Sequence, residues 1–151
     1  MPKTTWKPGT MIYPVPAVMV TCGDAPENYN IITIAWTGTI NSDPPMCYIS
    51  VRKSRYSHEI IKRTGEFVIN LTTQELAKAT DWCGVRSGKK YDKFKEMNLT
   101  PVPATSVKAP MIDLNFSYLS SLLYLSIFGS VIAFTTYLNL LGKVGPDKAG
   151  Y

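Results

Sequence analysis

Residues 31–61 read IITIAWTGTINSDPPMCYISVRKSRYSHEII, and they contain two predicted strands and the start of a helix. β-Branched and aromatic residues favour a strand over Ile31–Trp36, and a second strand is expected over Met46–Val51 after a turn at Asp43-Pro44-Pro45. The second strand leads into Arg52-Lys53-Ser54-Arg55-Tyr56-Ser57 and then into a helical pattern. A helix N-terminus presents free N–H groups and a positive dipole end, and arginine adds paired donors. This turn therefore suits an anion such as a phosphate.

The neighbouring segments predict a compact, strand-rich domain with helices in its connections. Further strands are expected over 17–22 and 66–71, and the first of these forms a hairpin with the returning residues 29–36. The chain lacks the βαβ rhythm and the glycine-rich turn of a dinucleotide-binding fold, which argues against a Rossmann domain. Helices are expected from an N-cap at Ser57 to Thr64 before Gly65, from a capping box at Thr72-Thr73-Gln74-Glu75 to Gly84, and over 89–97.

The composition excludes several kinds of site. With 151 residues, 45% of them hydrophobic, the chain has room for one domain with a real core. The net charge of +5 comes from cations interleaved with acids, which favours a solvated basic face over nucleic-acid binding. Three widely spaced cysteines form neither a disulfide framework nor a zinc pattern, which favours a reducing compartment such as the cytoplasm. The single histidine, His58, excludes a multi-histidine metal site, and we predict no metal ligand.

The composition changes in the last quarter of the chain. Residues 114–142 carry no Asp, Glu, Lys or Arg, and this segment is long enough for one helix to cross a bilayer. Small residues at spacings of three and four are typical of close-packing membrane helices; they are Ser126, Gly129, Ser130 and Ala133. The alternative is a buried helix of a soluble core or of a dimer interface.

Several motifs in residues 15–112 resemble the flavin reductase-like family, whose members resemble flavoredoxin and bind FMN on a split β-barrel. The resemblance is carried by residues 30–71 and by DWCGVRSGKKYDKF at 81–94, and TPVPATSVKAPMI at 100–112 extends it. It implies a mainly β fold with short helices (α+β), a bound FMN, and a homodimer with the flavin near the subunit boundary. Relatives of this kind continue into further strands that close the barrel, so the barrel expected here is incomplete.

The resemblance also implies which residues hold the cofactor. Backbone groups that pass the flavin ring would be those of Trp36, Thr37, Gly38 and Thr39. Ribityl and phosphate oxygens would be held by Ser50, Val51, Arg52, Ser54, Tyr56 and Ser57. The residue types agree with these roles, because small residues let a backbone approach a flat ring, and cations with hydroxyls satisfy a dianion. For Arg52 and Lys53 the alternative is an exposed strand end.

No side chain is predicted to be catalytic, because the isoalloxazine itself carries the electrons. Cys83 is expected to pack as a small hydrophobe at a helix end. His58 is expected to be a surface or phosphate-side donor, and Trp82 a core or flavin-edge aromatic. Residues 87–89 are expected to approach the flavin or the partner subunit.

Residues 117–151 depart from the family and resemble a fragment of an EamA-type drug/metabolite transporter, carried by YLSIFGSVIAFTTYLNLLGKVGPDKAG at 124–150. We therefore expect a flavin reductase-like domain over 1–112, without its C-terminal strands, and a hydrophobic, transmembrane-like helical segment over 113–151. A single helix of a multi-helix carrier cannot form a transport path. A fusion, a truncation and an assembly error all remain open for the junction.

Two functions follow as hypotheses. The first is an FMN-binding oxidoreductase that passes electrons from a reduced nicotinamide or a small electron carrier through flavin to an acceptor. The second is a membrane-associated fusion or truncated protein whose flavin domain is a non-catalytic remnant. The first places the protein in the cytoplasm, and the second adds membrane association through residues 114–142.

Overall fold

The computed structural model describes residues 4–10, 12–113, 135–136 and 139. The chain divides into two units, Met1–Asp113 and Leu114–Tyr151, and all of the strands and helices described below belong to the first. The predictions of an apolar membrane helix over 114–142 and of a transporter fragment over 117–151 fall almost entirely outside the described residues. In the part of the chain that is described, no helix has the length and apolar character needed to cross a bilayer.

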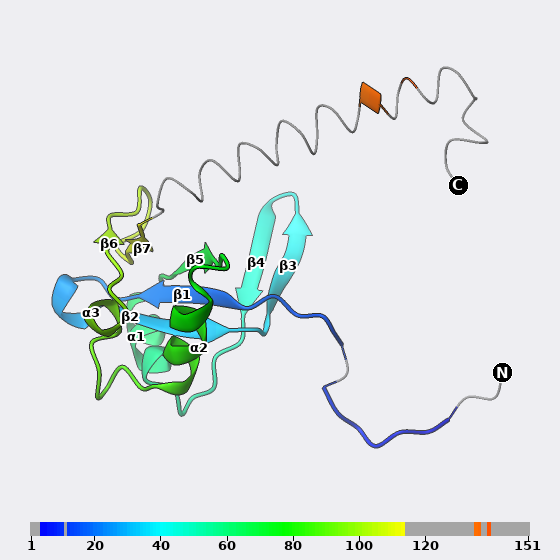
Figure 1. Cartoon of the computed structure of the whole chain (residues 1–151), viewed down its shortest axis with the longest axis horizontal. Helices are drawn as coiled ribbons and strands as arrows, with labels where there is room; N and C mark the ends of the chain where they lie inside the picture. The colour runs from blue at the N-terminus through cyan, green and yellow to red at the C-terminus, as the bar shows by residue number, and fades with distance from the viewer. Residues whose placement is uncertain (1–3, 11, 114–134, 137–138, 140–151) are drawn as a thin grey trace. The chain divides into compact units, whose positions relative to one another are not determined.

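An antiparallel sheet of three strands forms the centre of the first unit (Figure 1). Its middle strand is β1 (Val18–Cys22), flanked by β2 (Asn30–Ile34) and β5 (Val68–Leu71). Val20 stands opposite Ile32 on one side and Ile69 on the other, and all five residues of β1 are buried. The predicted hairpin between 17–22 and 29–36 is confirmed, as is the strand expected within 66–71.

A second antiparallel pair, β3 (Thr37–Ser42) with β4 (Pro45–Ile49), extends beyond the end of this sheet in Figure 1. The predicted turn at Asp43-Pro44-Pro45 is confirmed, since Asp43 and Pro44 join the two strands. Residues 37–39, which follow the predicted strand over Ile31–Trp36, pair with Cys47–Ile49 as part of β3. A third pair consists of the two-residue strands β6 (Pro101–Val102) and β7 (Met111–Ile112).

Short helices occupy the connections, and their ends differ from the predicted ones in three places. The helices are η1 (Pro26–Asn28), α1 (Tyr56–Thr64), α2 (Ala77–Val85) and α3 (Lys93–Glu96). The N-cap of α1 is Arg55, and Ser57 is instead the second residue of the helix and buried. The capping box at 72–75 is wrong because tight turns at 73–77 delay the start of α2. The predicted helix over 89–97 shortens to α3, whose N-cap Asp92 accepts a hydrogen bond from the Lys95 N–H.

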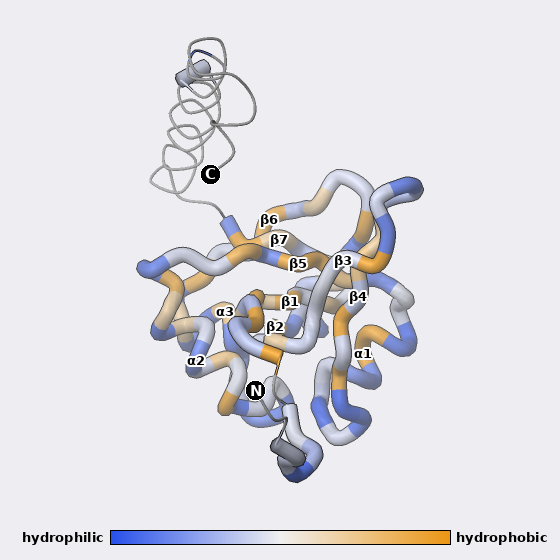
Figure 2. The backbone as a smooth tube through the Cα atoms, turned by 90° about the vertical axis from the view of Figure 1, so that its right-hand side faces the viewer, coloured by the Kyte–Doolittle hydropathy of each residue, from blue (hydrophilic) through white to orange (hydrophobic). Residues whose placement is uncertain are grey.

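The end of α1 is confirmed at Gly65. This glycine has a φ of 71°, in the left-handed region, and its N–H donates to the Ile61 carbonyl over 2.8 Å. The helix buries Ile60 and leaves Lys62 and Arg63 exposed, and Figure 2 shows hydrophobic and hydrophilic positions interspersed along it. One face of α1 therefore packs on the sheet, and the opposite face meets solvent.

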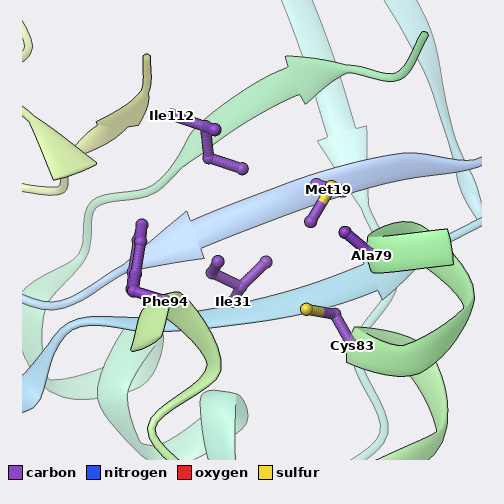
Figure 3. Close-up of a cluster of buried hydrophobic side chains, with 6 residues drawn as sticks. All are labelled: Met19, Ile31, Ala79, Cys83, Phe94 and Ile112. Atoms are coloured by element: carbon purple, nitrogen blue, oxygen red, sulfur yellow. The ribbon is translucent and has the colours of Figure 1, made fainter. Parts of the chain in front are cut away.

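Alternation along the strands separates two hydrophobic clusters. The first packs residues of β1 and β2 against α2, α3 and β7 (Figure 3), and it contains Met19, Ile31, Ala79, Cys83, Phe94 and Ile112. The second lies on the other face of the same strands and contains Val18, Val20, Ile32 and Ile34. Because neighbouring strand residues point to opposite faces, β1 contributes to both clusters. The predicted mainly β fold with short helices is thus confirmed.

Candidate functional site

Two adjoining depressions lie where β2 ends, where β4 leads into α1, and where α2 ends. The first, which we call the strand-end groove, measures about 310 Å³ and is lined by Ile32, Thr33, Ile34, Ala35, Trp36, Ser50, Val51, Arg52, Arg55, Thr80, Asp81, Gly84 and Val85. The second, the basic cavity, measures about 100 Å³ and is lined by Asn30, Ile32, Ser54, Arg55, Tyr56, Ser57, Cys83, Gly84, Arg86, Ser87, Gly88 and Lys93. Ile32, Arg55 and Gly84 border both depressions, so the two lie next to each other, and we refer to them together as the path.

The structure brings seven of the ten predicted cofactor residues to this path. Four of them line the strand-end groove: Trp36, Ser50, Val51 and Arg52. Three line the basic cavity: Ser54, Tyr56 and Ser57. Two backbone hydrogen bonds hold the turn between them, from Ser50 N–H to the Trp36 carbonyl (2.8 Å) and from Arg55 N–H to the Arg52 carbonyl (2.9 Å).

The other three predicted residues serve the β3–β4 hairpin. Of the described residues, Thr37, Gly38 and Thr39 line neither depression. The Thr37 hydroxyl donates to the Tyr48 carbonyl over 2.7 Å, and a Cβ on Gly38 would lie 3.0 Å from a ring carbon of Tyr48. The absence of a Cβ at Gly38 therefore makes room for a tyrosine of the opposite strand.

The basic cavity collects hydrogen-bond donors and positive charge. Arg55, Arg86 and Lys93 bring three cationic side chains, and Ser54, Ser57 and Ser87 bring three hydroxyls. Within the described part of the chain, no aspartate or glutamate borders it. An anion is the ligand that such a donor set favours.

The walls of the basic cavity are fixed by buried polar contacts. Asn30 and Ser57 are both buried, and the Asn30 amide nitrogen donates to the Ser57 hydroxyl over 2.8 Å. Gly88 lies directly against this amide, since a Cβ at Gly88 would overlap the Asn30 side chain. The sequence had suggested that Ser57 caps α1. Its burial behind Asn30 explains why it does not.

Lys93 is the most deeply buried charged side chain of the described residues, with 4% of its surface exposed. Its ammonium donates to the carbonyls of Ile31 and Cys83, both over 2.7 Å. Burial lowers the pKa of Lys93 from 10.5 to about 8; the neighbouring thiols of Cys83 and Cys22 counteract this effect and the Arg55 guanidinium adds to it.

The two buried thiols stay neutral at physiological pH. Burial raises the pKa of Cys22 to about 11, although a hydrogen bond with Ser57 and the charge of Lys93 act in the opposite direction. Burial also raises the pKa of Cys83, which packs in the first hydrophobic cluster as predicted. In the described residues, no group of histidine, cysteine and acidic side chains could hold a metal ion.

Of the remaining candidates, His58 and Trp82 lie outside the path, and residues 87–89 are divided between the basic cavity and a neighbouring groove. The His58 ring contacts the Glu59 carboxylate over 3.0 Å near the start of α1. Trp82 packs against the first hydrophobic cluster and meets the Tyr91 ring edge-on, with 5.5 Å between ring centroids. Of residues 87–89, Ser87 and Gly88 line the basic cavity, while Lys89 lines a neighbouring groove.

Sequence reasoning missed four residues of the basic cavity: Asn30, Arg55, Arg86 and Lys93. Arg55 stands in the predicted anion turn, so its charge was a usable signal. Arg86 and Lys93 lie more than thirty residues further along the chain, and Lys93 sits in a run of charged residues that indicates a solvated helix.

The chain is similar to proteins of known family and known structure. The profile of the flavin reductase like domain matches residues 10–120. Flavoredoxin of Desulfovibrio vulgaris (Miyazaki F) is 34% identical with a TM-score of 0.67, and the match covers 73% of this chain and 60% of that one. Flavoredoxin from Methanosarcina acetivorans is 30% identical with a TM-score of 0.65, covering 75% and 59%.

A curated but uncharacterised protein of Archaeoglobus fulgidus is 34% identical over 101 residues, which is 67% of this chain and 56% of that protein. The chain spans about half the length of the curated relatives it matches. The domain match continues past Ile112, where the sequence motifs ended, to residue 120. Since this match covers well over half of its residues, the chain belongs to the flavin reductase like domain family.

Proposed function

We propose that this protein is an FMN-dependent oxidoreductase, with the flavin ring in the strand-end groove and the phosphate in the basic cavity. The single observation that carries the proposal is the lining of the cavity, where three cations and three hydroxyls meet. A phosphate dianion offers only acceptors, and every charged group at this wall is a donor. The flavoredoxin relatives support the same ligand class.

The protein's own residues have binding and orienting roles in this proposal. Arg55 stands between the two depressions, where its guanidinium can hold the phosphate end of the ligand. Trp36, at the far end of the strand-end groove, offers a half-exposed indole to cover an apolar ring. Arg52 borders the groove rather than the cavity, so it would contact the ribityl chain or the ring edge. When bound, FMN would supply the hydride and electron chemistry.

The test is titration of FMN into the purified full-length chain, followed by quenching of flavin fluorescence. We expect Arg55→Ala and Arg86→Ala each to weaken FMN binding at least tenfold, because a hydrogen bond to a charged group is worth about 1.5–3 kcal/mol. Arg63→Ala is the matched control, since Arg63 pairs with Asp24 on the surface (3.0 and 3.1 Å). Flavin fluorescence that is not quenched by excess wild-type protein would refute the proposal.

For the electron donor, we propose a reduced nicotinamide or another small carrier that bears phosphate. A groove of about 550 Å³ shares Tyr56 and Gly88 with the basic cavity. Its charged lining residues are three lysines, Lys89, Lys90 and Lys95, and two acids, Glu27 and Asp92. We expect the Lys89→Gln, Lys90→Gln double variant to raise KM for the donor and to leave FMN affinity unchanged. Equal KM values for the wild type and the double variant would show that the groove does not bind the donor.

We also propose a cytoplasmic homodimer. The β3–β4 hairpin supports a second copy as partner, because it exposes large apolar side chains that a monomer in water would leave uncovered: Ile40, Met46 and Tyr48. Light scattering measures the mass in solution. The variant Ile40→Lys should shift it from dimer to monomer, and a monomeric wild-type protein would refute this assembly.

A second function follows from the chain's coverage of its relatives. The match spans about 60% of each flavoredoxin chain, and β2 and β5 are edge strands of the described sheet. Edge strands present unpaired backbone groups. If the edges of this sheet stay unpaired, the flavin domain is a non-catalytic remnant of a membrane-associated protein. Sedimentation with membranes, release only by detergent, and no flavin binding would together favour this alternative.

A further inference from the structure

Lys93 carries a positive charge into the interior without a negative partner. Lysine ammonium groups are almost never fully buried unless they are paired. Both carbonyl partners of Lys93 are neutral, so they satisfy hydrogen bonds without balancing the charge. The third N–H of the ammonium has no partner within the described residues.

The groups around Lys93 add positive charge or none. Arg55, from the turn before α1, and Arg86, from the end of α2, line the same cavity. Cys22 of β1 and Cys83 of α2 also face the ammonium, and burial keeps both thiols neutral. Tyr56 completes the titratable groups at this wall. Ion pairs in the described part of the chain join His58 with Glu59 and Arg63 with Asp24, and neither involves Lys93.

We propose that Lys93 is a specificity-determining residue, whose buried ammonium makes the site require an anionic group and so selects phosphorylated flavin over riboflavin. This inference rests on the proposed flavin site, but it concerns a different property of that site. An anion in the basic cavity supplies the missing counter-charge to Lys93. A neutral ligand such as riboflavin leaves the ammonium as uncompensated as it is in the free protein.

The same arrangement makes phosphate binding depend on pH. With the pKa of Lys93 lowered to about 8 by burial, the free protein loses this charge on going from pH 7 to pH 9. A bound dianion favours the charged form, so binding at pH 9 must be accompanied by proton uptake. If the dianion restores the pKa to its ordinary value, FMN affinity falls about tenfold between pH 7 and pH 9. Phosphate monoesters are already dianions throughout this range, since their second pKa is about 6.

The experiment compares FMN with riboflavin in three full-length proteins: wild type, Lys93→Met and Lys78→Met. Lys78→Met is the control, because Lys78 is exposed on α2. We expect wild type and control to prefer FMN by at least tenfold. Lys93→Met should lose at least tenfold in FMN affinity while its riboflavin affinity changes less than twofold. Equal losses for both ligands would show that Lys93 only supports the fold, and would overturn the proposal.

Two further arms keep the inference testable if Lys93→Met does not fold or if flavin does not bind. In the wild type, the dissociation constant of FMN should rise about tenfold from pH 7 to pH 9. A flat FMN profile would overturn the role of Lys93. If neither flavin binds at all, the proposed function is refuted. Inorganic phosphate then probes the basic cavity without flavin, and it should raise the melting temperature more at pH 7 than at pH 9. An equal rise at both pH values would overturn the role of Lys93.

Discussion

Replacing Lys93 by methionine should make the stability of the ligand-free protein less dependent on pH. The pKa of this lysine falls from 10.5 to about 8 on folding because burial disfavours the charged form. Between these two values the unfolded chain binds more protons than the folded one. The buried charge of Lys93 therefore destabilises the folded protein most at pH values below about 8. This penalty becomes smaller as the pH rises from about 8 toward 10.5.

The magnitude follows from the two pKa values. At 1.36 kcal/mol for each pH unit that separates them, the full penalty at neutral pH is about 3 kcal/mol. Raising the pH from 7 to 9 removes about 1 kcal/mol of it, which corresponds to a rise of about 4 °C in melting temperature for a domain of this size. The Lys93→Met substitution would also leave the carbonyls of Ile31 and Cys83 without a donor, but this cost does not depend on pH.

Urea unfolding of the wild type and of Lys93→Met at pH 7, 8 and 9 measures the difference between the two proteins. From pH 7 to pH 9, the free energy of unfolding of the wild type should increase by about 1 kcal/mol relative to that of the variant. The difference also contains the effect of Lys93 on the two buried thiols, because its charge lowers the pKa of Cys22 and of Cys83. Parallel pH profiles would mean that Lys93 keeps an ordinary pKa in the folded state, which would refute the argument that it is a desolvated, unpaired cation.

Three other changes test separate parts of the structure. Gly88→Ala should weaken FMN binding at least tenfold with little effect on secondary structure, because its Cβ would displace the side-chain amide of Asn30; binding titration and circular dichroism would show this. Asn70→Leu should lower the free energy of unfolding by about 2–3 kcal/mol, since it removes the acceptor of the buried Ile112 N–H (2.9 Å). Urea unfolding measures this free energy, and a loss below about 0.5 kcal/mol would contradict the role of the Asn70 amide. At pH 7.5 a thiol reagent should label the exposed Cys47 within minutes and the two buried cysteines only upon unfolding; rapid labelling of all three would contradict their burial.

Sequence patterns predicted the central sheet well because each of its strands is a short, β-branched run bounded by turn residues. The hairpin of β1 and β2 needs only local information: two apolar runs with Gly23 and Pro26 between them. The helix starts were predicted less well. Ser57 has the residue type of an N-cap, but its hydroxyl is taken by Asn30, which lies 27 positions earlier in the chain. A contact of that separation leaves no trace in a local pattern.

The same limit applies to the site, where some of the predicted residues line a depression and others do not. Trp36, Ser50 and Arg52 were predicted from a single stretch that the fold keeps together, and they line one groove. Gly38 was read as room for a ligand, whereas in the structure it makes room for a cross-strand tyrosine. Smallness alone does not say which neighbour approaches a glycine.

Burial of Lys93 is the property that the sequence conceals most completely. Its neighbours in KKYDKFKEM are charged, and a solvated helix was the natural expectation. The structure buries it because Phe94, the next residue, packs into the first hydrophobic cluster and draws the start of α3 against the β2 strand. Among the described residues, those that line the strand-end groove and the basic cavity lie between Asn30 and Lys93. The described walls of the path therefore depend on the packing of α3 against β2, which brings Lys93 to the carbonyl of Ile31.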